Sequence, residues 1–220
     1  MAAPTTVRPT GDLGLLLPAD WWVVPLTDRR AMRRSLAALA DRQFGRPDRP
    51  VPLKHQTRQA LERTAETAAA AGGRILAISL MTVRERPLTI TLTTFRQPPP
   101  SRVAGPSRLE RVAERLRAGA AEGTEVLLGE GPAGPVLRTV TVERGPAELG
   151  AQDIDQLVVR YLVDVGDRQG HFEAVFASPH VELREGLLDL YDTLVASVGH
   201  VPSPDDPHEG PQAPGAGGAA

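Results

Sequence analysis

The chain has 220 residues and a net charge of −2, with hydrophobic residues at 41% and charged residues at 24%, as in ordinary soluble globular proteins. This balance creates no positive field that would attract nucleic acid or an anionic membrane, so we expect neither as a partner. The chain has no cysteine, which excludes disulfides, thiolate nucleophiles, iron–sulfur clusters and cysteine zinc sites.

Three regions are expected along the chain. Residues 1–17 are predicted to form a flexible N-terminal arm. Residues 199–220 are rich in Pro, Gly and Ala and are predicted to be a disordered tail, because they cannot bury enough apolar surface to offset the entropy of ordering. A single folded domain is expected between them, over residues 18–198.

The first predicted elements are a strand and a helix. Trp21–Leu26 (WWVVPL) is apolar on both faces, and Pro25 removes a ladder hydrogen bond, so this segment is expected to be an edge strand or a strand end. A cap at Thr27 or Asp28 then starts a helix that runs to about Phe44.

A second helix and a β-hairpin follow. The helix is predicted from about Lys54 to Ala71, where Gly72 stops it. Ile75–Val83 is apolar on both faces, which indicates a central strand, and Leu88–Phe95 alternates leucine or isoleucine with threonine, which indicates a half-buried strand. We expect these two strands to pair.

The second half of the chain completes the fold prediction. It contains a short helix over 107–118, a strand pair over 125–129 and 135–143, a hairpin over 157–165 and 172–178, and a closing amphipathic helix after Pro179. Successive hairpins with interspersed helices predict an α+β fold, in which an antiparallel sheet of about six to seven strands is sandwiched between helices. No Gly-rich first turn marks a doubly wound nucleotide fold.

No motif in the sequence carries catalytic chemistry. The segment GEGPAGP, Gly129–Pro135, lacks the Lys-Ser/Thr ending of a phosphate loop and precedes a strand, so it is interpreted as a hairpin turn. The carboxylates of Asp153 and Asp155 provide too few ligands for Mg²⁺ or Ca²⁺, and neither HExxH nor GxSxG is present. We therefore expect no catalytic residue, no metal and no cofactor, and no enzyme activity.

Two features favour a protein partner. Arginines on the first helix stack like charges at i,i+4 spacing, which an anionic partner would relieve, although a solvated helix face explains them as well. Two adjacent tryptophans point to opposite faces of a strand, so one packs in the core while the other is covered by a helix or anchors a partner. The partner-binding candidates are Trp21, Trp22, Arg29, Arg30, Arg33 and Arg34.

The ends of the domain resemble a known family. A WVVPL strand before a long helix, and a closing segment FASP followed by LREGLLDLYDTLVASV, resemble the α/β/α sandwich shared by the photosystem protein PsbP and the Ran-binding import factor Mog. In that family the late residues of the closing helix follow the pattern 'fd.i..S'. Tyr191, Asp192 and Ser197 lie at the aromatic, aspartate and serine positions of this pattern. The start of the expected domain also resembles the LPxxWxxxPL opening of actinobacterial proteins of unknown function. The matching residues are Leu17, Pro18, Trp21 or Trp22, and Pro25-Leu26. The chain is also rich in arginine, which resembles the codon bias of such bacteria.

Members of that family mostly act as assembly factors or adaptors, so the resemblance implies such a role. The family has no shared catalytic residues, so the resemblance implies none for this chain. The first functional hypothesis is a non-enzymatic adaptor in the cytoplasm, since the N-terminus lacks the pattern of a signal peptide and no apolar run spans a membrane. The second is a small-ligand binder or enzyme that uses a cleft between sheet and helices, with candidates Asp153, Asp155, His171 and His180. The third is a subunit of a homo-oligomer that covers the threonine face of 88–95 with its own copy.

Overall fold

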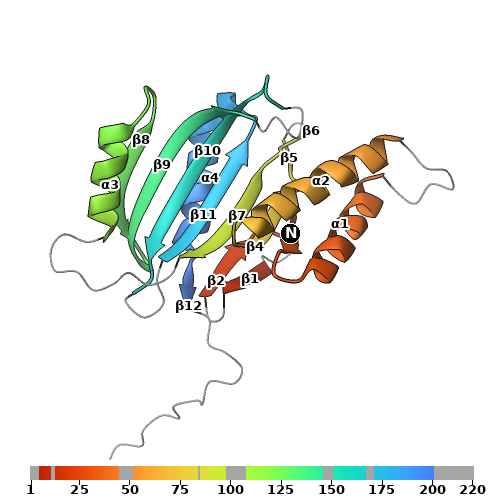
Figure 1. The fold of residues 1–220 in the computed structure, drawn as a ribbon, viewed down its shortest axis with the longest axis horizontal. Helices are drawn as coiled ribbons and strands as arrows, with labels where there is room; N and C mark the ends of the chain where they lie inside the picture. Colours follow the sequence, from red (N-terminus) through yellow and green to blue (C-terminus); the bar gives the residue numbers. More distant parts are fainter. Residues whose placement is uncertain are drawn as a thin grey trace, which may run out of the picture.

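The computed structural model describes residues 5–10, 13–44, 52–83, 85–97, 108–145, 151–166 and 171–200. Their main feature is a seven-stranded antiparallel sheet in the order β3-β4-β7-β11-β10-β9-β8 (Figure 1). Its strands are β3 Trp21–Pro25, β4 Gly73–Ser79, β7 Thr91–Gln97, β11 His171–Ser178, β10 Asp155–Asp164, β9 Gly134–Arg144 and β8 Glu125–Gly131. The predicted α+β class and strand number are confirmed.

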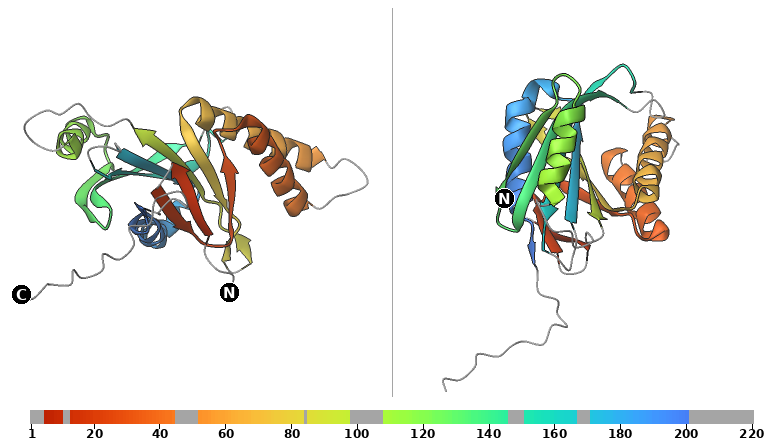
Figure 2. Two further views of the ribbon diagram at one scale, coloured as in Figure 1. Left: turned by 90° about the horizontal axis from the view of Figure 1, so that it is seen from below. Right: turned by 60° about the vertical axis from the view of Figure 1, so that its left-hand side comes forward.

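Helices lie on both faces of this sheet. Helices α1 (Arg29–Phe44), α2 (Pro52–Ala70) and α3 (Arg108–Gly119) lie on one face, and α4 (Arg184–Ala196) lies on the other (Figure 2). A short 3-10 turn, Val181–Leu183, leads into α4. Helix α2 contacts β4 at one end of the sheet, and α3 contacts β8 and β9 at the other.

A second, three-stranded sheet lies beside α4 on the same face. It consists of β1 (Thr5–Thr10), β2 (Leu13–Leu17) and β12 (Gly199–His200) in the order β1-β2-β12. A further two-stranded pair, β5 (Thr82–Val83) with β6 (Arg86–Pro87), follows β4. No helix in the described ranges is long and apolar enough to cross a membrane.

The terminal segments differ from the prediction. Residues 1–17 were expected to be a flexible arm, whereas β1 and β2 pair with each other and are part of the fold. Leu13, Leu15 and Leu17 have exposures of 1% or less, because the alternating leucines of LGLLL turn one face of β2 into the core. Gly199 and His200, which were expected to belong to the disordered tail, instead form β12 and pair with β2. The remaining residues of the expected tail, 201–220, lie outside the described residues.

The apolar pattern of the strands produces separate cores on the two faces. The larger core lies between the sheet, α4 and β2, and it contains Trp21, Tyr161, Phe176 and Tyr191. On the other face, one cluster joins α1 and α2 to β3 and β4, and another joins α3 to β8 and β9. No described helix covers the strands between α2 and α3, which therefore present their outer side to the surface (Figure 1).

Individual residues explain where α1 begins and where α2 ends. Oδ1 of Asp28 accepts hydrogen bonds of 2.8 Å and 3.1 Å from the backbone N–H groups of Arg30 and Ala31, so Asp28 is the one of the two predicted residues, Thr27 and Asp28, that caps α1. Gly72 adopts a φ of 88° directly after α2, the left-handed conformation in which glycine ends helices. Ser107, at which the helix over 107–118 was predicted to begin, lies outside the described residues.

Candidate functional site

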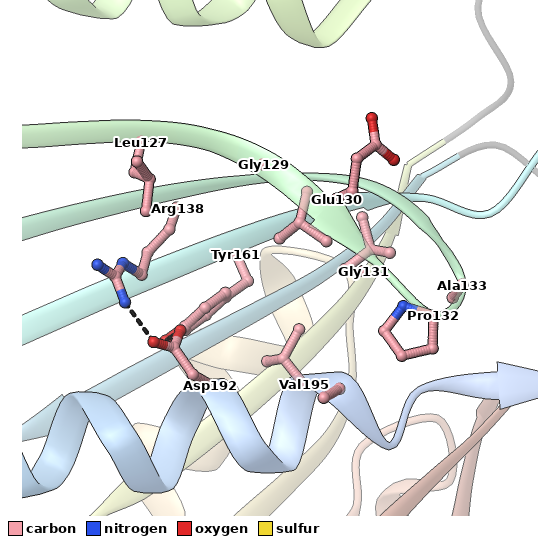
Figure 3. Close-up of a pocket in the computed structure, with 13 residues that line it drawn as sticks. Leu127, Gly129, Glu130, Gly131, Pro132, Ala133, Arg138, Tyr161, Asp192 and Val195 are labelled. Atoms are coloured by element: carbon pink, nitrogen blue, oxygen red, sulfur yellow. Dashed lines mark hydrogen bonds and ion pairs between the residues drawn. The ribbon is translucent and has the colours of Figure 1, made fainter.

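A pocket of about 210 Å³ lies between the β8–β9 hairpin and α4 (Figure 3). We call it the hairpin pocket; its lining includes Leu127, Gly129, Val136, Arg138, Tyr161, Val163, Asp192, Val195 and Ala196. Aliphatic side chains from strand and helix form most of its walls, and three polar side chains meet at one end (Figure 3). It is the kind of concave, mostly apolar site that binds small molecules.

A tight turn holds the hairpin over the pocket. Strand β8 ends at Gly131 and β9 begins at Gly134, which confirms that GEGPAGP is a hairpin turn. Gly134 has a φ of 131°, and a Cβ atom there would lie 2.2 Å from the carbonyl oxygen of Asp164. Glycine is therefore required at this position, since only its missing side chain lets the turn approach β10 so closely.

The polar end of the pocket is a linked set of three side chains. The Tyr161 hydroxyl donates a hydrogen bond of 2.7 Å to Oδ1 of Asp192. Nη1 of Arg138 forms an ion pair with Oδ2 of the same carboxylate. Arg138 and Tyr161 are register partners on β9 and β10, and Asp192 reaches them from α4. We call these residues the Arg–Asp–Tyr cluster.

Burial and pairing fix the charge of this cluster. Burial raises the pKa of Tyr161, and the hydrogen bond to Asp192 raises it further. Burial lowers the pKa of Arg138, but the hydrogen bond and charge of Asp192 together with the effects of Tyr161 outweigh burial, so the net pKa is raised. At neutral pH Tyr161 is thus a neutral donor and Arg138 a cation. The two side chains supply hydrogen bonds and charge at neutral pH, and neither is poised to transfer a proton.

Stacked aromatic rings support the cluster from below. The rings of Phe176 and Tyr191 stack with centroids 4.2 Å apart and planes 12° apart. Tyr161 meets Phe176 edge-on at 5.8 Å. Both geometries are favourable for aromatic pairs, so they hold α4, which carries Asp192, against β10 and β11.

A second hollow lies on the opposite face of the sheet. This groove of about 400 Å³ runs between α2 and the uncovered strands, and we call it the central groove. Its α2 wall is made of Thr64, Thr67, Ala68 and Ala71, and its apolar floor of Phe95, Val158, Val175 and Ala177. At its far rim Arg144 pairs with Asp155 at 3.1 Å. Exposed Arg160 also lines it, and within the described part of the chain this guanidinium has no ion pair.

The structure separates the two candidate tryptophans. Trp21 is 7% exposed and belongs to the core on the α4 side. Trp22 is half-buried against α1, where its Nε1 donates a hydrogen bond of 3.0 Å to Oγ of Ser35. Ser35 donates in turn to the Val23 carbonyl at 3.1 Å, and the Arg42 guanidinium lies 5.7 Å from the Trp22 ring centre. Both rings therefore pack within the domain.

The candidate arginines form a partly neutralised helix edge. Arg29 and Arg33 both pair with Glu66 of α2, at 3.0 Å and 3.6 Å. Arg30 and Arg34 are exposed; both interact electrostatically with Asp28, and neither forms an ion pair with a described residue. The repulsion expected along α1 is thus relieved in part by α2, and the assignment of this surface to a partner stays a prediction.

The candidates for the ligand or enzyme hypothesis are not brought together at either hollow. Asp155 pairs with Arg144, while Nε2 of His180 accepts a bond of 3.2 Å from the backbone of Thr89. His171 is 1% exposed, with its Nε2 3.8 Å from Asp164, and burial lowers its pKa. Within the described ranges, no group of three or more His, Asp or Glu residues is placed to hold a metal ion.

Sequence reasoning missed the Arg–Asp–Tyr cluster, although one signal for it was present. Arg138 interrupts an alternating apolar series, Val136 and Val140, on the inward face of β9. A charged residue at such a position indicates a buried partner. That partner, Asp192, is 54 residues away on α4, a distance that only the tertiary fold closes.

No family model, no curated protein and no solved structure matches the chain. Function is therefore inferred from the geometry and chemistry of the hairpin pocket and the central groove.

Proposed function

We propose that the protein is a non-enzymatic adaptor or assembly factor of the cytoplasm, and that it binds one amphipathic helix of a protein partner in the central groove. The observation that carries this proposal is the interrupted helix layer on one face of the sheet. Helices α2 and α3 cover the two ends of that face, while the strands between them keep a groove with an apolar floor.

The interruption in the helix layer is wide enough for an added helix. Between β4, which α2 contacts, and β8, which α3 contacts, the sheet advances by five strand spacings, or about 24 Å. Helices pack with their axes roughly 8–10 Å apart. An additional helix can therefore lie beside α2 at this packing distance and cover the central groove.

The surfaces that such a helix would meet are suited to close packing. The α2 wall carries only alanine and threonine, small side chains that let a neighbouring helix approach. On the floor, Val158 is 7% exposed, while Phe95, Val175 and Ala177 are half-buried. An apolar stripe at i, i+3, i+4 and i+7 of a partner helix is the surface that would cover these residues.

Arg160 adds a charge preference. Its register partners are Val175 on β11 and Thr139 on β9, so it stands in the middle of the uncovered strands. With no carboxylate paired to it among the described residues, Arg160 would bind an acidic residue beside the apolar stripe of the partner helix. The resemblance to PsbP and Mog supports the same role, since that family consists mostly of adaptors and assembly factors.

The test compares two single charge reversals in a tagged full-length chain used to capture its partner from the source organism. Arg160→Glu lies in the central groove, and Arg30→Glu is the matched control on α1. We expect Arg160→Glu to weaken capture of the same protein by at least about tenfold, and Arg30→Glu to retain it. Loss of capture with Arg30→Glu alone would assign the contact to the predicted α1 surface and overturn the groove.

A steric pair of variants makes the result independent of charge. Thr67→Trp fills the groove from the α2 wall, and Ala38→Trp adds the same side chain to the exposed surface of α1. Only Thr67→Trp should abolish binding of a fluorescent peptide that carries the partner's amphipathic helix. Equal binding by both variants would contradict the proposal, and so would capture of nothing but a second copy of this chain.

A further inference from the structure

We infer that the hairpin pocket binds a small uncharged molecule with a single-ring or branched apolar body and one hydroxyl or amide group. The pocket lies on the α4 face of the sheet and the central groove on the other, so this ligand site is separate from the proposed partner site. Three observations carry the inference: the size of the pocket, its aliphatic walls and the balanced charge at its polar end.

The volume of the hairpin pocket and its aliphatic walls determine the size and apolar character of the ligand. An apolar cavity of about 150 Å³ holds benzene, and the hairpin pocket has about 210 Å³. Leu127, Val136, Val163 and Val195 supply aliphatic surface around this space. Leu127 lines the pocket and is 53% exposed, and a bound apolar ring would cover part of this surface.

The polar end of the pocket determines which polar group the ligand should carry. Asp192 is paired with Arg138 and hydrogen-bonded by Tyr161, so the Arg–Asp–Tyr cluster has no net charge to attract an ion. Each carboxylate oxygen still has a free lone pair, and a guanidinium has five N–H donors, of which Asp192 uses few. A hydroxyl or primary amide can donate to Asp192 and accept from Arg138 at once. A carboxylate or ammonium group can do only one of these and would leave its charge unbalanced.

A substitution at Gly129 should close the pocket. Gly129 lines it, and a Cβ atom built there meets no other atom within 4 Å. Gly129→Leu therefore fills the space without displacing backbone, and leucine suits a strand better than glycine. Gly119→Leu, at the end of α3 and also with open space around the new Cβ, is the matched control.

The experiment is a ¹H–¹⁵N NMR titration of the full chain with benzyl alcohol, benzoate and benzylamine, which share one ring and differ in charge. We expect benzyl alcohol to shift the amides of Gly129, Ala133, Val195 and Ala196 with a Kd of about a millimolar, and both ions to bind at least about threefold more weakly. Gly129→Leu should remove the shifts, and Gly119→Leu should keep them.

Several results would overturn the inference. These are an absence of shifts at the pocket, an ion that binds as tightly as the alcohol, or unchanged binding by folded Gly129→Leu. Ala196→Phe, from exposed Ala196 of α4, closes the same pocket from the opposite wall. It must also abolish the shifts, so a folding defect in one variant does not decide the outcome.

Discussion

The Tyr161 hydroxyl donates a hydrogen bond of 2.7 Å to Oδ1 of Asp192, and this bond joins the middle of the sheet to α4. Tyr161 is 1% exposed, whereas the side chain of Asp192 is 48% exposed. The bond therefore satisfies a buried donor with an acceptor at the mouth of the hairpin pocket. Arg138 holds the second oxygen of that carboxylate, so the three residues depend on one another.

The first prediction concerns this dependence. Tyr161→Phe removes the buried donor and should lower the free energy of unfolding by about 0.5–1.5 kcal/mol. Asp192→Asn should lower it as well, and the double variant should show a coupling of about 0.5 kcal/mol or more. Urea unfolding of the four proteins measures this. Strictly additive effects would show that the two side chains are not coupled.

The second prediction concerns alkaline pH. The chain has two tyrosines, Tyr161 and Tyr191, and burial raises the pKa of both above the ordinary value of 10.0. Above pH 10 the unfolded chain loses protons that the folded chain retains. Stability is therefore full below that pH and falls as pH rises, by about 1.4 kcal/mol per pH unit for each tyrosine.

Tyrosinate absorbance provides the measurement. As pH is raised, no tyrosinate should form until the protein unfolds, and both rings should then ionise together with the loss of circular dichroism. A folded protein that shows the absorbance of one ionised tyrosine would contradict the buried positions of these hydroxyls.

The local pattern of the sequence predicted most elements because each one depends on neighbouring residues. The apolar segments Leu157–Val165 and Phe172–Ser178 located the β10–β11 hairpin, and Asp28 was one of two residues predicted to start α1. The leucines of β2 alternate in the sequence as in a half-buried strand, but residues 1–17 were expected to form a flexible arm. Their burial depends on β12 and α4, almost two hundred residues later.

Neither hollow could be predicted, because each depends on strand order. Several antiparallel arrangements fit the same hairpins. The order observed puts α2 and α3 at opposite ends of one face, and only this separation leaves the central groove. The hairpin pocket likewise requires the β8–β9 turn to lie above α4, a contact between segments some sixty residues apart in sequence.

The third prediction concerns acid. Burial lowers the pKa of His171 from its ordinary 6.5, against the opposing effect of Asp164 and with Arg108 and Arg96 contributing in the same direction as burial. Below pH 6.5 the unfolded chain takes up a proton that the folded chain resists, so this contribution to stability is present above that pH and is lost as pH falls through the lowered pKa.

His171→Phe tests this expectation because it removes the titrating group and keeps a ring of similar size. In urea unfolding, wild type should lose more stability than the variant between about pH 7 and about pH 5. Parallel losses in both proteins would show that His171 is not the group responsible.

The fourth prediction concerns Trp22, the tryptophan that packs against α1. Ser35→Ala removes the hydroxyl that accepts from Trp22 Nε1 and donates to the Val23 carbonyl. Stability should fall by about 1–2 kcal/mol, because two part-buried groups lose their partner. Partner capture should be unaffected, since Trp22 packs within the domain. Impaired capture by the folded variant would restore Trp22 as a contact residue.

The central claim is that a partner helix lies in the groove between α2 and α3, and photo-crosslinking tests it most directly. A benzoylphenylalanine is placed at Ala177 on the groove floor, and in a second protein at Ala38 on the exposed side of α1. The account predicts that Ala177 alone crosslinks the captured partner, within one amphipathic helical segment that carries an acidic residue. Crosslinks from Ala38 and none from Ala177 would contradict it.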